Sequence, residues 1–292
     1  MKYLHFIVNP ISGKGHNTLE QTELLNLFPS EQYKIAVSYT ERKGHAHEIA
    51  LNAINEGAHC LIACGGDGTV NEVASAIVGT RVLLGIIPMG SGNGLASNLG
   101  IQGSLTQILT KLKAMEALEI DCGHVNGHYF FSNTGLGIDA EIIKKYEQGG
   151  SRKLLAYISA ALKASLSFRY YRTIVRIDNI ENEINPLMLF VSNSNEMGYG
   201  MSLTPQAKLN DSYLDLVVIP RLSFVQKLLL GLHVLNRSFP KFNKAQSLRM
   251  QSLFIHQPER IYTDIQIDGE YHSLKTNKIN IEILRAALKV VV

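Results

Sequence analysis

The feature that constrains this fold most is an apolar segment that runs directly into a glycine-rich turn. Residues 59–64 form a continuous apolar run, which is typical of a strand buried on both faces of a parallel sheet. The sequence Gly-Gly-Asp-Gly-Thr follows at positions 65–69, and a helical pattern continues over residues 70–78. Because glycines let backbone N–H groups approach a ligand closely, the pattern predicts a parallel α/β sheet with a binding loop at a strand end.

The start of the helix after this turn favours a phosphate. Thr69 and Glu72 have the spacing of a capping box, which indicates that a helix begins here. The N–H groups and the positive dipole end of a helix start attract anions. Asp67 adds a charge that a simple tight turn does not need. We therefore expect a phosphate-bearing ligand here rather than a turn alone.

Two further loops repeat this design. Residues 9–15, Asn-Pro-Ile-Ser-Gly-Lys-Gly, follow an apolar run over residues 3–8, and residues 88–94, Pro-Met-Gly-Ser-Gly-Asn-Gly, follow one over residues 82–87. Since parallel strands end at one edge of a sheet, the three loops predict a shared nucleotide site. Lys14 is either a phosphate ligand or a surface charge. The chain has no Walker A motif, which disfavours an ordinary P-loop kinase.

The pattern changes after about residue 121. A helix-rich stretch over residues 148–167 precedes strand-like runs at 173–178, 187–192, 213–219, 252–256 and 262–267. Runs of strands without regular crossover helices indicate an antiparallel sheet or sandwich. We expect an α/β domain over residues 1–122, with a helix from about Asn17, and a β-rich domain over residues 123–283. A tail over residues 284–292 can pack back on the first domain.

The three loops, together with two later motifs, resemble the diacylglycerol kinase catalytic family, which includes bacterial lipid kinases, sphingosine kinases and ceramide kinases. The later motifs are Asn-Thr-Gly-Leu-Gly-Ile-Asp-Ala at residues 133–140 and Asp-Gly-Glu at residues 268–270. The resemblance covers nearly the whole chain. It implies an NAD kinase/diacylglycerol kinase-like α/β domain with a parallel sheet, followed by a mainly antiparallel β-sandwich that binds the substrate. The implied activity transfers the γ-phosphoryl group of ATP to a lipid hydroxyl in phospholipid biosynthesis.

The resemblance also implies roles for individual residues. Asp67 would act near the ATP phosphates and their Mg²⁺, and Asp268 or Glu270 would accept the proton of the lipid hydroxyl. We favour Asp268 as the base and leave the reverse assignment open; without the family, Asp268-Gly269 would be interpreted as a hairpin turn. The residues implied to bind ATP are Asn9, Pro10, Ser12, Gly13, Lys14, Thr40, Gly65, Gly66, Asp67, Gly68, Thr69, Asn71, Glu72, Ser91 and Asn93.

A structural Mg²⁺ site is implied in the second domain. Asp211 would supply a carboxylate there, and Lys208 and Tyr213 would supply carbonyl oxygens, a ligand type that suits Mg²⁺. Ser212 stands where the family usually has glycine, so the local backbone decides whether the site forms. The third loop contains Gly-Ser-Gly-Asn-Gly at residues 90–94, closer to the sphingosine and ceramide kinase form. The lipid, whether diacylglycerol, a sphingoid base or a similar alcohol, stays open.

Charge is distributed unevenly along the chain. Residues 1–122 hold 8 basic and 11 acidic residues, whereas residues 123–292 hold 20 and 14. The basic second domain predicts peripheral contact with an anionic membrane, centred on residues 144–176 and 221–249. A solvated basic face and a helix packed on the core are the alternatives.

The expected location is the cytoplasm, with peripheral membrane association. No stretch approaches the ~20 apolar residues that span a bilayer. Three cysteines without metal-binding spacing fit free thiols in a reducing compartment. No nucleic-acid partner is expected because no recognised module occurs and the first domain is acidic. A homodimer is left open.

Two alternative functions remain open. An NAD kinase shares the glycine-aspartate loop, but it would leave the Asp-Gly-Glu motif at residues 268–270 unexplained. A catalytically silent nucleotide or lipid sensor would not need Asp67, Asp268 and Glu270, all of which are present.

Overall fold

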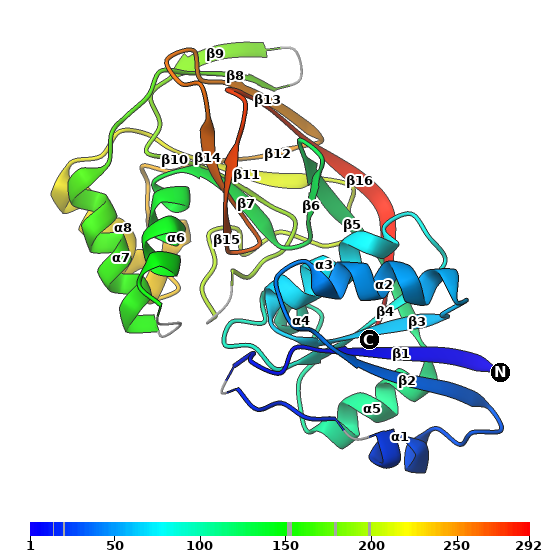
Figure 1. Cartoon of the computed structure of the whole chain (residues 1–292). Helices are drawn as coiled ribbons and strands as arrows, with labels where there is room; N and C mark the ends of the chain where they lie inside the picture. The colour runs from blue at the N-terminus through cyan, green and yellow to red at the C-terminus, as the bar shows by residue number, and fades with distance from the viewer. Residues whose placement is uncertain (14, 20, 151–153, 178–179, 198–199) are drawn as a thin grey trace. The chain divides into compact units, whose positions relative to one another are not determined.

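The chain forms two compact units in the computed structural model (Figure 1). Unit 1 comprises residues 1–121 and 285–292, and unit 2 comprises residues 122–284. The structure describes residues 1–13, 15–19, 21–150, 154–177, 180–197 and 200–292. Two strands run from one unit into the other: β5 (Ala117–Val125) and β16 (Lys278–Val291).

Unit 1 is a parallel sheet with helices on both faces. Its remaining elements are β1 (Lys2–Val8), α1 (Gln21–Leu27), β2 (Tyr33–Tyr39), α2 (His45–Asn55), β3 (Cys60–Gly65), α3 (Asp67–Ile77), β4 (Leu83–Pro88), α4 (Gly94–Asn98) and α5 (Leu105–Ala114). The strand order is β2-β1-β3-β4, and the last residues of β16 extend the sheet parallel to β4. α2 and α3 cover one face, and α1 and α5 cover the other (Figure 1).

The strands of unit 1 end at the same level. Val8 pairs with Tyr39 and with Cys64, and Cys64 pairs with Ile87 on its other side. The loops that follow these strands therefore leave the sheet at one edge, as expected for parallel strands. β3 is buried along its whole length, which explains its uninterrupted apolar sequence.

Unit 2 is an antiparallel sandwich with helices on its outer side. Its strands are β6 (His128–Phe130), β7 (Asn133–Gly137), β8 (Thr173–Ile177), β9 (Ile180–Ile184), β10 (Met188–Ser192), β11 (Leu214–Ile219), β12 (Gln246–Met250), β13 (Ser252–His256), β14 (Thr263–Ile267) and β15 (Glu270–Leu274). One layer has the order β12-β11-β10-β7-β14-β15, and the other has the order β16-β13-β8-β9, with β5 beside β16 and β6 beside β5. The helices are α6 (Ile138–Gln148), α7 (Leu154–Ser167), α8 (Phe224–Leu235) and the short 3₁₀ turn η1 (Phe239–Lys241).

Strand β10 shows how the six-stranded layer serves two cores. Leu189 and Val191 belong to the core between the two layers, whereas Met188 and Phe190 belong to a second core with the helices. The residues alternate because successive side chains of a strand point to opposite faces. α8 contributes Leu230 to the second core. With both faces covered, β10 is apolar over almost its whole length.

The expected fold class is confirmed, and each strand named above is found with its ends shifted by no more than one residue. The helix expected from Asn17 is wrong, because α1 begins at Gln21. Asn17 instead uses its side-chain amide to donate to the carbonyls of Asn9 (3.2 Å) and Ser12 (2.8 Å). The helical stretch expected over residues 148–167 contains α7, and a further helix, α6, precedes it from Ile138.

Phe190 tests the second core of unit 2. Its side chain is only 1% exposed, so Phe190→Ala should lower the free energy of unfolding by ~3–5 kcal/mol through lost apolar contact and an unfilled cavity. Urea unfolding followed by circular dichroism measures this loss. Phe254→Ala, at a partly exposed phenylalanine of β13, is the control and should cost clearly less. Equal losses in the two variants would contradict this description of the core.

Candidate active site

The loops after β3 and β4 contact each other through their backbones. Met89 donates its N–H group to the carbonyl oxygen of Gly65 (2.8 Å). A Cβ atom on Gly66 would lie 3.2 Å from the Cα of Gly90, and one on Gly90 would lie 2.5 Å from the Cα of Gly66. Glycine is required at Gly90 because any side chain there would push the two loops apart.

The loop after β1 packs against the same place. A Cβ atom on Gly13 would collide with the carbonyl oxygen of Met89. Asn9 donates its N–H group to the carbonyl of Cys64 (2.9 Å) and its side-chain amide to Oγ1 of Thr69 (3.1 Å). Three loops that are distant in sequence therefore form one continuous surface of backbone and small side chains.

Thr40 and Asn93 also lie on this edge. Thr40 follows β2 and donates its N–H group to the carbonyl of Val8 (2.9 Å). The side-chain amide of Asn93 bonds to both the N–H and the C=O groups of Gly90, each at 2.9 Å. Asn93 therefore holds the third loop in its conformation. This role differs from the direct contact with ATP that was expected of Asn93.

The remaining residues expected to bind the nucleotide differ in exposure. Ser12 is buried and hydrogen-bonds within the first loop, whereas Ser91 is exposed. Pro10, Gly68 and Asn71 are half-buried at the same edge, and Lys14 lies outside the described residues.

Helix α3 begins at the glycine-aspartate loop. Its N-cap is Gly66, which makes no side-chain cap bond, and Asp67 is its first residue. The hydrogen bond from Val70 to Gly66 (3.0 Å) is the first of the helix, so the N–H groups of residues 67–69 lie before it. Such N–H groups, together with the helix dipole, are what binds phosphate at a helix start.

The expected capping box of Thr69 and Glu72 is wrong. The carboxylate of Glu72 accepts N–H groups from the start of α2 instead, from Gly44 (2.7 Å) and from Ala46 (3.0 Å). A carboxylate is favoured there because it satisfies N–H groups at the positive end of the helix. Glu72 therefore fastens α2 to α3, and both of its carboxylate oxygens are directed away from a phosphate role.

In unit 2, Asp268 and Gly269 form the two-residue turn between β14 and β15. Their φ angles are 46° and 80°, the positive values that a type I′ hairpin turn requires. The Asp268 carboxylate accepts three backbone N–H groups, from Phe131 (2.9 Å), Ser132 (2.8 Å) and Asn133 (2.9 Å). The side chain therefore ties the hairpin to the segment that joins β6 to β7.

Glu270 follows this turn as the first residue of β15 and is half-buried. The expected catalytic carboxylates are divided between the units, because Asp67 belongs to unit 1 and both Asp268 and Glu270 belong to unit 2. Within unit 2, the two acids have different surroundings. The oxygens of Asp268 already bind the protein's own donors, which leaves them less able to take a proton from a substrate.

Asp139 belongs to the motif at residues 133–140 but was not predicted to be a site residue, and the structure buries its carboxyl group. Asp139 lies in the first turn of α6 and is 6% exposed, and its Oδ2 atom has no hydrogen-bond partner among the described residues. Burial raises the pKa of Asp139 to about 6, although a hydrogen bond from Gln266 acts in the opposite direction. A Cβ atom on Gly135 would collide with this oxygen. The feature of the sequence that could have indicated this buried acid is its position in an otherwise apolar, glycine-rich motif.

The segment around Asp211 keeps the backbone shape that glycine would provide. Ser212 has a φ of 66°, a left-handed conformation that is uncommon for serine. Asp211 accepts the N–H group of Tyr213 with Oδ1 (3.1 Å), and its Oδ2 pairs with the guanidinium of Arg249. The same guanidinium lies 4.5 Å from the centre of the Tyr213 ring, a distance typical of a cation–π contact.

Two family profiles together match almost the whole chain. The profile described as "Diacylglycerol kinase catalytic domain" matches residues 3–125. The profile described as "YegS C-terminal NAD kinase beta sandwich-like domain" matches residues 132–292, more than half of the chain. The chain belongs to the diacylglycerol kinase family. The expected family and enzyme class, a kinase, are thereby confirmed.

Relatives of this kinase extend over the same length. "Probable lipid kinase YegS" of Salmonella arizonae is 30% identical over 96% of this chain and 93% of its own. "Diacylglycerol kinase" of Staphylococcus aureus MRSA252 is 28% identical over 96% of this chain and 90% of its own. The crystal structure of a diacylglycerol kinase from Bacillus anthracis covers 99% of this chain and 96% of that chain, with a TM-score of 0.77 and 21% identity. This likeness shows the fold.

The residues implied to hold a structural Mg²⁺ do not fit that ion in this kinase. Mg²⁺ needs anionic or carbonyl oxygens at its centre, and the carboxylate of Asp211 is already neutralised by Arg249. No cluster of three or more His, Cys, Asp or Glu residues suited to a metal occurs in the described part of the chain. With only carbonyls left from Lys208 and Tyr213, the set lacks a vacant charged ligand.

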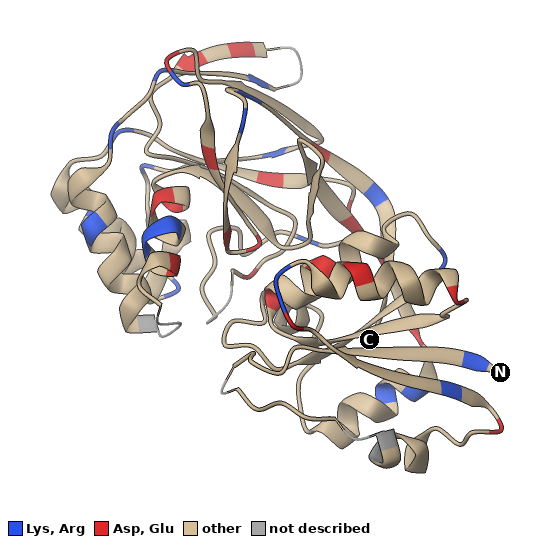
Figure 2. Ribbon diagram, in the orientation of Figure 1, with Lys and Arg blue, Asp and Glu red and all other residues tan. Residues whose placement is uncertain are grey.

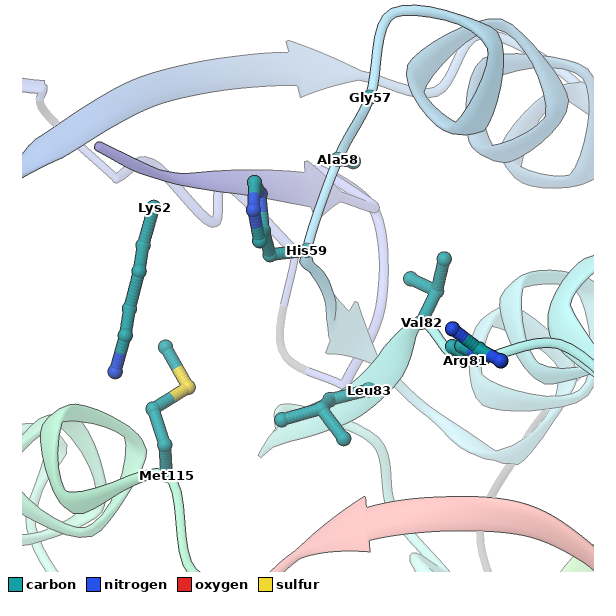
Figure 3. A pocket seen from close by; sticks show the side chains of 8 residues that line it. All are labelled: Lys2, Gly57, Ala58, His59, Arg81, Val82, Leu83 and Met115. Atoms are coloured by element: carbon teal, nitrogen blue, oxygen red, sulfur yellow. The ribbon is translucent and has the colours of Figure 1, made fainter.

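A cavity of about 390 Å³ lies elsewhere in unit 1 (Figure 3). Lys2, His59 and Leu83, at or beside the amino ends of β1, β3 and β4, contribute to its lining together with Arg81 and Met115. The glycine-rich loops follow the carboxyl ends of the same strands. The cavity and the candidate nucleotide site are therefore on opposite edges of the sheet.

Asp139 should make the stability of the kinase depend on pH. Its pKa is raised from 3.8 to about 6 in the folded state, so the folded protein holds a proton that the unfolded chain releases between those values. The free energy of unfolding therefore falls as pH rises through this window, by up to ~3 kcal/mol. Asp139→Asn should remove this slope. Urea unfolding at pH 4 and pH 7.5 measures it, with the exposed Glu181→Gln as control; a slope unchanged in Asp139→Asn would refute the assignment.

Mg²⁺ alone should leave the stability of the nucleotide-free kinase unchanged. Mg²⁺ at a concentration 100 times the Kd of a site would add ~2.7 kcal/mol to the free energy of unfolding. The Asp211–Arg249 pair leaves no such site. Thermal unfolding in EDTA and in millimolar MgCl₂ should give the same midpoint. Arg249→Gln exposes the carboxylate and should gain a Mg²⁺ response if the guanidinium is what excludes the ion. A clear Mg²⁺ stabilisation of the unmodified protein would contradict this reading of the site.

Proposed function

We propose that this kinase transfers the γ-phosphoryl group of ATP to the hydroxyl group of a lipid, either diacylglycerol or a sphingoid-type alcohol. The observation that carries the proposal is the backbone contact of three glycine-rich loops at one edge of the unit 1 sheet, beside the start of α3. Small residues there leave room for phosphates to approach N–H groups. The names of the relatives, lipid kinase and diacylglycerol kinase, support a lipid as the acceptor.

Unit 1 would hold the nucleotide. The N–H groups of residues 67–69 would receive phosphate oxygens, and Asn9 and Asn93 would keep the surrounding loops in shape. Asp67 and Asn71 offer hard oxygen donors one turn apart on α3, a donor type that fits Mg²⁺. The ion, when bound with ATP, would neutralise charge on the phosphates.

Unit 2 would supply the general base, and we assign this role to Glu270 rather than to Asp268. Three N–H groups bind the Asp268 carboxylate, so this residue positions the turn that presents Glu270. Glu270 would take the proton of the lipid hydroxyl while the lipid oxygen forms a bond to the γ-phosphorus. The bond from this phosphorus to the bridging oxygen breaks, and ADP leaves with the electron pair.

The basic character of unit 2 supports peripheral contact with a cytoplasmic membrane surface, where such a lipid is found. Residues 122–284 hold 18 basic and 14 acidic residues. Each Lys or Arg close to an anionic bilayer contributes ~1 kcal/mol of attraction. Electrostatic adsorption of this kind would bring the enzyme to a substrate that does not leave the membrane.

The proposal is tested with ATP labelled at the γ-phosphate and diacylglycerol or a sphingoid base in mixed detergent micelles. Label should enter one of the lipids, and removing Mg²⁺ should stop the transfer. Adding NAD⁺ as an alternative acceptor tests the NAD kinase function. Label in NAD⁺ and none in lipid would overturn the proposal, and label in neither acceptor, with ATP bound normally, would favour a nucleotide sensor.

Glu270 and Asp268 should respond differently to substitution. Glu270→Gln should lower turnover by ~10²-fold or more, because it removes the proton acceptor, while the unfolding midpoint and ATP affinity stay unchanged. Asp268→Asn places an amide among N–H donors and should lower the free energy of unfolding by ~1–3 kcal/mol. Calorimetric ATP titration, thermal unfolding and turnover should be measured on both. If Asp268→Asn keeps its full stability but loses turnover, Asp268 rather than Glu270 is the general base.

A further inference from the structure

Helix α8 carries its apolar side chains on the solvent side. Six of them are more than a third exposed: Phe224, Val225, Leu228, Leu229, Leu232 and Leu235. Because successive residues of an α-helix turn by ~100°, these six share an arc of about 140°. The exposed fraction reaches 63% at Val225 and 54% at Leu232. Only Leu230, on the opposite side, is buried in the core with the six-stranded layer.

The polar side chains of α8 point toward the protein. Lys227 is half-buried, and its Nζ atom donates to the carbonyl of Ser165 on α7 (2.8 Å). Nδ1 of His233 lies 2.9 Å from Oγ of Ser238, also at a half-buried position. A surface helix of a soluble domain normally has the reverse arrangement, with its apolar face toward the core. A contiguous apolar face turned outward marks an interaction surface.

Helix α7 packs beside α8 and adds a second apolar stripe (Figure 1). Leu155, Leu162 and Leu166 are exposed, and their spacing of seven and four residues places them on one side of the helix. Neither helix contains an acidic residue (Figure 2). We call the exposed apolar residues of α7 and α8 the apolar helix surface.

The chain on either side of the apolar helix surface is basic. Residues 154–177 contain four Lys or Arg residues and no acid, and residues 221–250 contain six and no acid. Those that are exposed are Lys163, Arg169, Arg172, Arg176, Arg221, Arg237, Lys241, Lys244 and Arg249. Arg172 and Arg249 pair with Glu183 and Asp211, but Lys163 lies on α7, and Arg221 and Arg237 adjoin the two ends of α8 in the chain. Apolar residues with cations close by match the layered chemistry of an anionic bilayer, in which phosphates lie above hydrocarbon.

We propose that the apolar helix surface inserts into the interface of an anionic phospholipid bilayer and anchors the kinase there. α8 has 12 residues and is ~18 Å long, shorter than the ~30 Å hydrocarbon core. Among the described residues, no helix has the length and hydropathy needed to cross a bilayer. α8 therefore lies along the membrane surface with its arc of leucines facing the acyl chains. Insertion of apolar side chains adds to the electrostatic adsorption described above. The anchor rests on the proposed function only in its role, which is to bring the kinase to a lipid substrate.

A second copy of the chain fits this surface less well. Joining two copies through α8 would cover the leucines, but it would also bring two acid-free basic segments together. Like charges across an interface oppose association. A bilayer that contains phosphatidylglycerol covers the leucines and supplies anions at the same time.

The chain contains no tryptophan, so a single introduced tryptophan reports the insertion directly. Leu229→Trp places the reporter within the arc of α8, and Leu51→Trp places it on the exposed side of α2 in unit 1 as the control. Vesicles of phosphatidylcholine with about a quarter phosphatidylglycerol should shift the emission of Leu229→Trp to shorter wavelength. Brominated acyl chains should quench it. Leu51→Trp should change little. Equal responses, or none at position 229, would overturn the proposal.

A second pair of variants tests the contribution to binding. Leu229→Ser/Leu232→Ser should weaken vesicle binding at least tenfold, and the loss should persist at about 0.5 M NaCl, where charge interactions are screened within a few ångströms. Leu25→Ser/Leu51→Ser, at two exposed leucines of unit 1, should bind like the unmodified protein. Equal affinity of all three proteins would reject the anchor. A dimer in solution that dissociates in Leu229→Ser/Leu232→Ser would assign the surface to a second copy instead.

Activity toward a short-chain form of the accepted lipid in detergent micelles, either dioctanoylglycerol or a short-chain sphingoid base, separates this proposal from the proposed function. Leu229→Ser/Leu232→Ser should retain this activity and lose at least tenfold on long-chain lipid in vesicles. Insertion without phosphorylation of either lipid would reject the proposed function and leave the anchor supported. If the lipids are phosphorylated and Leu229→Ser/Leu232→Ser keeps its full activity on vesicles, the anchor is rejected and the proposed function stays supported.

Discussion

The close approach of Gly66 and Gly90 is the constraint on which the candidate nucleotide site depends. Two loops from neighbouring parallel strands pass within contact distance, and the third loop is joined to them through Asn9 and Gly13. Strand register makes this meeting unavoidable, because all the strands concerned end at one level. Side chains at the crossing would separate the loops, so the sheet edge is built from backbone. A backbone surface that includes the N–H groups at the start of α3 suits phosphate better than it suits an uncharged ligand.

Unit 2 is organised around a different constraint, the covering of one sheet on both faces. Strand β10 divides its residues between the sandwich core and the helix core. The hairpin that bears Glu270 is fastened to this framework by the side chain of Asp268. Rigid support of this kind would keep the carboxylate that we propose as the base within hydrogen-bonding reach of its target. Helices α7 and α8 complete the second core with few residues, which leaves their remaining apolar side chains available to a partner.

The sequence was sufficient for the elements and for the loops, because both depend on local patterns. Apolar runs that end in glycine identify strands and turns within a few residues. The contacts of Asp268, Glu72 and Asp211 were not predictable in this way. Asp268 binds residues 131–133, Glu72 binds the start of α2, and Asp211 pairs with Arg249. Each partner is remote in sequence. The side that α8 turns outward was also undecided, since a helical period fixes an apolar face but not its direction.

Strand β16 gives this kinase an unusual order of assembly. Residues 285–292 belong to unit 1, and Val290, which is completely buried, pairs beside Leu84 of β4. During synthesis the ribosome makes all of unit 2 between the two segments of unit 1. Until residues 285–292 emerge, β4 is an unpaired edge of the unit 1 sheet, and such edges invite pairing with other chains. Unit 2 can thus fold during translation, whereas unit 1 is finished last and has the greater need of protection by chaperones.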